Sequence, residues 1–407
     1  MKNWAAYVTL LLALSIASIG AWRAVRAGDA SASSSAGYSS AWDPKSAAQY
    51  LDSREVWWQK WPLAQMDHGT VCVSCHTVVP YALVRPALRR ELNGNGMAPA
   101  EQAMLASIEK RVTDWSEVRP FYTDADYGPG KTEQSRATEA VLNAVILSSY
   151  DSASGHLSPL TRAAYDEAWA LQQKTGQDAG GWKWQDFHLA PWESSESAYQ
   201  GAALMAVALG DAPDDYAGEN GVRENLEQLK QYLRRNYDAQ PLMSKLYVLW
   251  ASARIPGLLT EADRTKLIGE IADLQLRDGG WALSSLDEQS RKHEYLDEWK
   301  RLTNTGESDG CATGLVVLAF EMIGAKQNEQ VLQRGLEWLE NHQSKTGSWW
   351  ATSLNGPSDA DSDIGRFMSD AATGYAVLAL ENARPNNASL TQQGTGLPAR
   401  KANLNQE

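Results

Sequence analysis

The apolar residues of the chain follow a helical period over most of its length. From Glu133 to about Asn382, apolar helical patterns alternate with Gly-rich or charged loops, and no convincing strand alternation occurs. Four amphipathic segments in this stretch have one apolar face: 159–174, 221–236, 261–275 and 329–343. Other segments are apolar nearly all the way round, and such a helix must be buried on every face. The pattern predicts an array of helical hairpins, with apolar helices inside and amphipathic helices outside.

An internal repeat supports this arrangement. The segments 308–321 (SDGCATGLVVLAFE) and 369–381 (SDAATGYAVLALE) both begin with Ser-Asp and then run apolar. Fainter copies occur at 135–142 and 196–204, and 243–253 supplies one more apolar helix. Four of these helices carry a polar residue near the start, expected near one rim of the array: Thr138, Gln200, Thr313 and Thr373.

The amphipathic helices end in a recurring sequence, basic-Gly-x-x-aromatic-Leu-x-x-x-Gln-x-x-x-Gly-x-Trp. It is clearest at 334–349, recognisable at 266–281 and looser over 172–182. The Gln side chain can bond backbone groups at the helix end, Gly permits the turn, and Trp stacks against the next hairpin. The pattern resembles the QW repeats of squalene–hopene and oxidosqualene cyclases and, more distantly, is similar to the β subunits of protein prenyltransferases. This resemblance implies an all-α fold, an α/α toroid of about five hairpins over 131–384, whose central apolar cavity binds isoprenoid chains in those families.

The cyclases carry an Asp-x-Asp-Asp-Thr-Ala acid motif at the start of an inner helix, and the candidates here are Asp309 and Asp370. Neither belongs to an Asp-Asp pair, whereas protonating an alkene requires a carboxylic acid strengthened by a second carboxyl. A single Asp at a helix N-terminus is expected to have a lowered pKa and to act as an ionised cap. Asp309 and Cys311 look like two ligands of the prenyltransferase zinc site, but the expected third ligand, a His, has no counterpart near Ala371. An isoprenoid cyclase or isomerase with Asp309 or Asp370 as the catalytic acid is therefore the alternative function.

A different chemistry is indicated by Cys72-Val73-Ser74-Cys75-His76. In a CxxCH motif the two thiols add to the vinyl groups of haem, and the His becomes the proximal iron ligand. A redox CxxC or a zinc knuckle would be the other interpretation, but the chain has no second CxxC and the flanks are not thioredoxin-like. We therefore expect covalent haem c in a small cytochrome-like domain over 42–130.

The second iron ligand is expected to be Met97. It lies in the sequence NGMAP (95–99), which looks like the distal-ligand loop of small c-type cytochromes. Met97 is only 21 residues beyond His76, a short spacing for that family. The alternatives are Met66, His68 and Met104.

The first 27 residues are typical of an export signal. An apolar run over 5–22 is followed by small residues, Val25 and Ala27, at the −3 and −1 places of a cleavage site. Because the run is also close to the length of a membrane helix, cleaved signal and membrane anchor both stay open. Residues 28–41 have a linker composition, and 385–407 are expected to be a disordered tail. We expect a periplasmic protein or one anchored on the outer side of the cytoplasmic membrane.

Composition narrows the range of partners. The chain has 407 residues and a formal charge of −13, which argues against nucleic acid or anionic membrane surfaces as the main partner. Its three cysteines exclude a disulfide scaffold. The sequence thus favours a mono-haem redox or sensing protein whose toroid binds an isoprenoid-like ligand or a redox partner. A plain protein-interaction scaffold, with inner faces closed onto one another, is a third interpretation.

Overall fold

The computed structural model describes residues 41–94, 96–118, 128–287, 306–325, 328–355 and 359–384. Within these ranges the chain is helical, and its β structure is limited to two isolated bridges. Tyr38–Glu407 forms one compact unit. The expected signal or anchor (1–27), the linker apart from its last residue, and the tail (385–407) lie outside the described residues. Among the described helices, none is long and apolar enough to cross a membrane.

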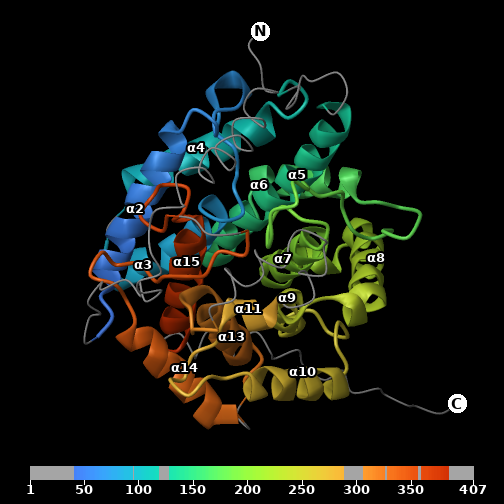
Figure 1. Cartoon of the computed structure of the whole chain (residues 1–407). Coiled ribbons are helices and arrows are strands. Elements are labelled where there is room, and N and C mark those ends of the chain that lie inside the picture. The colour runs from blue at the N-terminus through green and yellow to red at the C-terminus, as the bar shows by residue number, and fades with distance from the viewer. Residues whose placement is uncertain are drawn as a thin grey trace, which may run out of the picture. The chain divides into compact units, whose positions relative to one another are not determined.

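Among the helices that the structure describes, six form a closed inner ring (Figure 1). In chain order they are α3 (Val78–Glu91), α5 (Gly128–Ser154), α7 (Ser197–Asp211), α9 (Leu242–Ser252), α13 (Gly310–Met322) and α15 (Phe367–Asn382). Each of these helices contacts the next one, and α15 packs against α3. Since they are surrounded on all sides, most of their residues are buried, as the all-round apolar pattern predicts.

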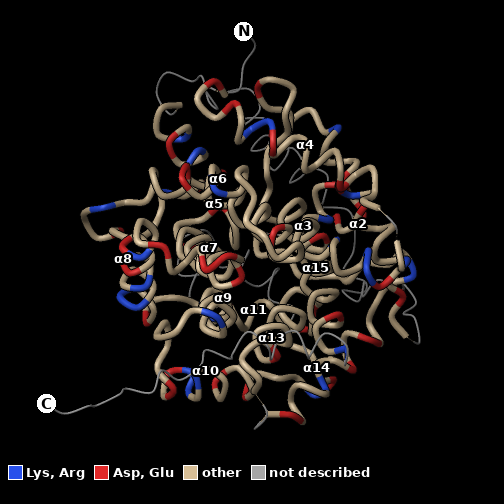
Figure 2. Tube along the Cα trace, turned by 180° about the vertical axis from the view of Figure 1, so that it is seen from behind, with Lys and Arg blue, Asp and Glu red and all other residues tan. Residues whose placement is uncertain are grey.

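Six outer helices alternate with the inner ones along the chain. They are α2 (Pro44–Lys60), α4 (Pro99–Thr113), α6 (Pro159–Leu171), α8 (Asn220–Asn236), α10 (Glu261–Asp273) and α14 (Glu329–Asn341). A short helix, α11 (Leu283–Leu286), precedes α13. Figure 2 shows acidic and basic segments along α8, α10 and α14. The all-α toroid expected from the sequence is thus confirmed, with amphipathic helices outside apolar ones.

The ring has six hairpins rather than about five, because it begins at α2. The helices α2, α3 and α4 fall in the range 42–130, for which the sequence predicts a separate cytochrome-like domain. Instead, α3 packs between α5 and α15, and α2 packs on α3 and α15. The expected boundary at residue 130 lies inside α5. The N-terminal helices belong to the toroid because, without them, the inner faces of α5 and α15 would be left uncovered.

The recurring Gln-Gly-Trp sequence joins each of three outer helices to the next. Gln343 Nε2 donates to the carbonyl of Gly347 at 3.0 Å and to that of Asp43, before α2, at 3.1 Å. Equivalent pairs of bonds join Gln172 to Gly180 and Asn225, and Gln275 to Gly279 and Val331. The indoles of Trp182, Trp281 and Trp349 donate back to carbonyls of the preceding outer helices, at Ala168, Ile271 and Leu339.

Candidate functional site

The CxxCH segment, residues 72–76, lies directly before α3, the first helix of the inner ring. The Trp58 indole donates to the carbonyl of Cys72 at 2.8 Å. The Ser74 hydroxyl accepts from the main-chain N–H of Thr77 and Val78, which turns the chain into α3. Cys72 and Cys75 are free thiols. Desolvation raises the pKa of Cys72 to about 12 and that of Cys75 well above its ordinary value, so both are held as protonated thiols.

The His76 imidazole is enclosed by aromatic rings. Phe367, the first residue of α15, stacks on it with ring centroids 3.9 Å apart. Trp58 meets it edge-on at 5.1 Å, and Trp192 lies at 5.8 Å. Desolvation, with a smaller contribution from the charge of Arg54, lowers the pKa of His76 to about 3. The imidazole is therefore neutral at physiological pH, the form in which histidine binds metals.

Asp370, on the first turns of α15, connects to this histidine through one side chain. The buried Asp370 carboxylate accepts from Tyr50 Oη, Arg54 Nε and Thr77 Oγ1, each at 2.8 Å. Thr77 Oγ1 lies 2.9 Å from His76 Nδ1. Burial raises the pKa of Asp370, while the Arg54 guanidinium and the other donors oppose that shift. Three donors converging on one carboxyl make Asp370 a hydrogen-bond acceptor.

Asp370 does not cap its helix, contrary to expectation. The N-cap position of α15 is Arg366, which makes no side-chain capping bond. The side chain of Asp370 is directed instead to α2 and to the residue after the CxxCH motif.

Asp309 is a cap, as the sequence predicts. It is the N-cap of α13, where its Oδ1 accepts from the N–H groups of Cys311 and Ala312, each at 3.0 Å. Its Oδ2 accepts from Leu283 N–H at 2.7 Å. Burial nevertheless raises the pKa of Asp309 to about 7, so the expected lowering of that pKa is wrong. Among the hydrogen bonds of the described residues, neither Asp309 nor Asp370 is joined to a second carboxyl, the feature that alkene protonation requires.

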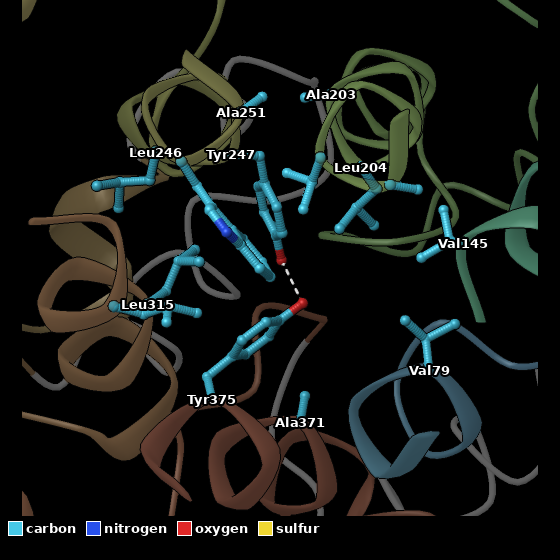
Figure 3. Close-up of a cluster of buried hydrophobic side chains, with 14 of the residues drawn as sticks. Val79, Val145, Ala203, Leu204, Leu246, Tyr247, Ala251, Leu315, Ala371 and Tyr375 are labelled. Atoms are coloured by element: carbon cyan, nitrogen blue, oxygen red, sulfur yellow. Dashed lines mark hydrogen bonds between the residues drawn. The ribbon is translucent and has the colours of Figure 1, made fainter. Parts of the chain in front are cut away.

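The centre of the ring is filled by side chains. The hydroxyls of Tyr247 (α9) and Tyr375 (α15) meet at 2.8 Å, and apolar side chains from all six inner helices surround them (Figure 3). A cavity of about 10 Å³ lies beside them, with Cys75, Trp192 and Gln200 in its wall. That volume holds about one water molecule. Among the described residues at the ring centre, this cavity is therefore not open to an isoprenoid chain of the kind that the cyclase resemblance implies.

The polar residues expected at one rim support the Gln-Gly-Trp loops. The hydroxyls of Thr138, Thr313 and Thr373 accept the main-chain N–H of Gln185, Trp281 and Trp349, at 2.9, 3.0 and 3.1 Å. Gln200 donates to Ser244 Oγ at 3.2 Å. The threonine contacts fasten loops to the starts of inner helices, whereas the Gln200 contact joins α7 to α9, and both kinds of contact are structural.

Met97 is not brought to His76. It follows the far end of α3, a 14-residue helix that spans about 20 Å, and its side chain is 39% exposed. Met104 is buried on α4, whereas Met66 and His68 lie in the loop before Cys72. His68 Nδ1 pairs with Asp67 Oδ2 at 3.2 Å. Among the described residues there is no cluster of three or more His, Cys, Asp and Glu side chains that could hold a metal ion.

The residues of the segment fit a c-type haem by their donor chemistry. Two unpaired thiols and a neutral imidazole are the groups that such a haem requires. The buried Trp192 Nε1 beside them has no hydrogen-bond partner. A polar group of a ligand that accepted from this N–H would supply the missing bond. The rings of Trp192 and Phe367 now cover His76, so loading requires them to move.

Several residues of this site were missed at the level of sequence. They are Tyr50, Arg54, Trp58, Thr77, Trp192 and Phe367. The sequence does contain one signal for this site, the adjacent tryptophans Trp57 and Trp58 in a mostly polar segment. Two such large rings in a polar helix indicate that the helix packs against another surface.

Comparison with known proteins adds little beyond the fold. No protein-family model matches the chain, and no curated protein matches its sequence. Two solved structures resemble it, one described as a wild-type glycosidase and one as a glycosidase variant. The variant is 10% identical to this chain, with a TM-score of 0.46, and the match covers 85% of this chain and 98% of the variant. The wild type is 11% identical, with a TM-score of 0.45, and the match covers 83% of this chain and 97% of the wild type. At this level of similarity neither carries an argument about chemistry, and the α/α toroid rests on the helix contacts described above.

Proposed function

We propose that the chain is an exported mono-haem c-type protein with a redox or sensing role. Cys72 and Cys75 would hold the haem through thioether bonds, and His76 would bind its iron. The observation that carries this proposal is the geometry of the CxxCH segment, in which two free thiols precede an imidazole whose Nδ1 lies 2.9 Å from the Thr77 hydroxyl. Its Nε2 is thereby left as the nitrogen for a metal. A haem bound there supplies one-electron exchange.

The chain's own residues prepare this site. Trp58 and Phe367 pack on two sides of the imidazole and fix its plane. The hydrogen bond from the Trp58 indole to the Cys72 carbonyl ties the main chain at the first cysteine to α2. A low-dielectric surrounding of this kind is one of the properties that set the potential of a bound haem.

For the toroid, a redox partner is favoured over an isoprenoid ligand. The central space of about 10 Å³ would have to widen for a polyene chain, as it would for a haem bound at Cys75 in the same cavity wall. The two thiols and the imidazole offer specific bonds to a haem, whereas an isoprenoid chain gains no such bond from them. Acid catalysis is also disfavoured, because Asp370 is paired with Arg54 and Asp309 accepts three main-chain N–H groups. Incubation with squalene in detergent should therefore give no cyclised product by mass analysis. Pentacyclic product that disappears in Asp309→Asn or Asp370→Asn would establish the cyclase alternative instead.

The haem itself is tested by attachment. We expect protein produced with a haem-attachment system to show the reduced α band of a c-type cytochrome and to keep its haem in acidified acetone. Cys72→Ala with Cys75→Ala should lose the covalent haem. Cys311→Ala, which removes a buried thiol on α13 outside the motif, is the matched control and should keep it. Release of intact haem from the wild type by acidified acetone would refute the proposal.

A further inference from the structure

We propose that Thr77 and Asp370 are positioning residues that hold His76 as its Nδ1–H tautomer, so that the last helix of the toroid controls the iron ligand. The effect on haem rests on the proposed function above. The tautomer itself is a property of the apoprotein and can be tested without haem.

The direction of the hydrogen bonds follows from counting protons. A threonine hydroxyl carries one hydrogen and can donate only once. Thr77 donates to Asp370 Oδ2 at 2.8 Å, so its oxygen must accept in the contact of 2.9 Å with His76 Nδ1. The proton of the neutral imidazole therefore resides on Nδ1, and Nε2 presents its lone pair.

Asp370 is fixed as the acceptor at the end of this chain of bonds. Its other oxygen accepts from Arg54 Nε and Tyr50 Oη. Arg54 is held in turn by Asp363, through Nη1 to Oδ1 at 3.0 Å and Nη2 to the carbonyl at 2.7 Å, and it lies over the Trp57 ring at 4.5 Å. These contacts fix the orientation of the buried carboxylate toward Thr77.

The preceding repeat offers an internal comparison. Asp309 occupies the corresponding helix start, yet it bonds only main-chain N–H groups. The bond from Asp370 to Thr77 is therefore not a general property of the repeat. It is found where the toroid meets the CxxCH segment, and α15 contributes both this carboxylate and the Phe367 ring stacked on His76.

A histidine that donates its second N–H toward a carboxylate is oriented and made more basic as a metal ligand, and loss of such a partner typically changes metal binding 10- to 100-fold. A more basic imidazole favours ferric over ferrous iron. The Thr77–Asp370 pair should therefore lower the midpoint potential of a haem bound at His76.

The first test uses the apoprotein. We expect ¹⁵N NMR of histidine-labelled protein to show the Nδ1–H tautomer for His76, with Thr77→Ser retaining it and Thr77→Val losing it in favour of a mixture. Valine keeps the shape of threonine and removes only the hydroxyl, and circular dichroism confirms the fold of each variant. An Nε2–H tautomer in the wild type, or no change in Thr77→Val, would overturn the inference.

The second test uses the haem-loaded protein. Thr77→Val should raise the midpoint potential by at least the equivalent of a tenfold change in relative ferric binding, which is 59 mV for a one-electron couple. Thr77→Ser should restore it, and Asp309→Asn, in the repeat without this link, should leave it unchanged. Covalent haem with an unshifted potential in Thr77→Val would sink the inference and leave the proposed function standing. A wild type without covalent haem would refute the proposed function, while the tautomer measurement would still decide the inference.

Discussion

Gln343 and Asp43 close the ring of helices across 300 residues of sequence. Gln343 Nε2 donates to the Asp43 carbonyl at 3.1 Å, and Asp43 N–H donates to Gln343 Oε1 at 2.5 Å. Asp43 is the N-cap of α2, so this contact joins the end of α14 to the beginning of α2. It repeats the way in which Gln275 joins α10 to α14. The first hairpin is thus held in the ring by the same bonds as the later ones.

Replacement of Gly347 by alanine should open this closure. Gly347 has a φ of +91°, and an added Cβ would lie 2.1 Å from the Ser46 carbonyl oxygen. Strain at positive φ and the backbone clash together should cost about 3 kcal/mol of unfolding free energy. The control is Gly324→Ala, at φ +64° with no atom near the added Cβ, which should cost about 1 kcal/mol. Equal losses in urea unfolding would show that the contact with α2 does not matter.

The tyrosine pair at the ring centre should behave as a coupled unit. Tyr247→Phe or Tyr375→Phe leaves the other hydroxyl buried without its partner, which should cost about 1–3 kcal/mol. The double variant removes both hydroxyls, so its loss should be smaller than the sum of the single losses. A double-mutant cycle in urea measures this difference. Additive losses would mean that the two hydroxyls do not depend on each other.

Glu55 should make the protein less stable as pH rises. It is 1% exposed, its Oε2 has no hydrogen-bond partner, and desolvation raises its pKa from 4.5 to about 7. The folded state therefore retains a proton that the unfolded state releases, so stability present below pH 4.5 is lost as the pH rises through 7. Glu55→Gln should flatten this part of the profile and stabilise the protein above pH 7 by on the order of 3 kcal/mol. Glu109→Gln, which removes an exposed carboxyl on α4, controls for the change in net charge; an unchanged profile in Glu55→Gln would contradict the prediction.

Met97 should be dispensable for both stability and haem. Its partly exposed side chain predicts a change of no more than about 0.5 kcal/mol for Met97→Ala, with an unchanged haem spectrum. Met104→Ala, which removes a side chain that is 1% exposed, should cost about 2–5 kcal/mol in the same urea titration. A shift of the visible spectrum in Met97→Ala would restore Met97 as an iron ligand.

The toroid could be predicted from sequence because its supporting residues are local. In the segment 334–349, the bonds from Gln343 to Gly347 and from Trp349 to Leu339 lie within one helix end and the loop after it, although Gln343 also reaches Asp43. The role of α2 and α3 could not be predicted in this way. Both helices pack against α15, and no local pattern records a contact across nearly the whole chain.

In the candidate site, too, the residues that lie together in sequence could be predicted, whereas the distant ones could not. The CxxCH motif is contiguous and could be recognised directly. The hydrogen-bond partner of its histidine is Thr77, the next residue. Whether Thr77 donates or accepts in that bond depends on Asp370, which is 293 residues away. From the sequence, Asp370 stands out only by its position at a helix start. Its partners Arg54 and Tyr50 lie on α2, which the sequence predicts to be part of another domain.

The distance in sequence between Thr77 and Asp370 also fixes an order of events during synthesis. The chain grows from its N-terminus at roughly 5–20 residues per second, so the 293 residues from Thr77 to Asp370 take about 15–60 s to follow. Throughout that interval Cys72, Cys75 and His76 exist without the helix whose Phe367 stacks on His76 and whose Asp370 accepts from Thr77. An enzyme that modifies the two thiols would find them without α15 in a chain that has not yet closed its ring, whereas afterwards it must open a finished ring.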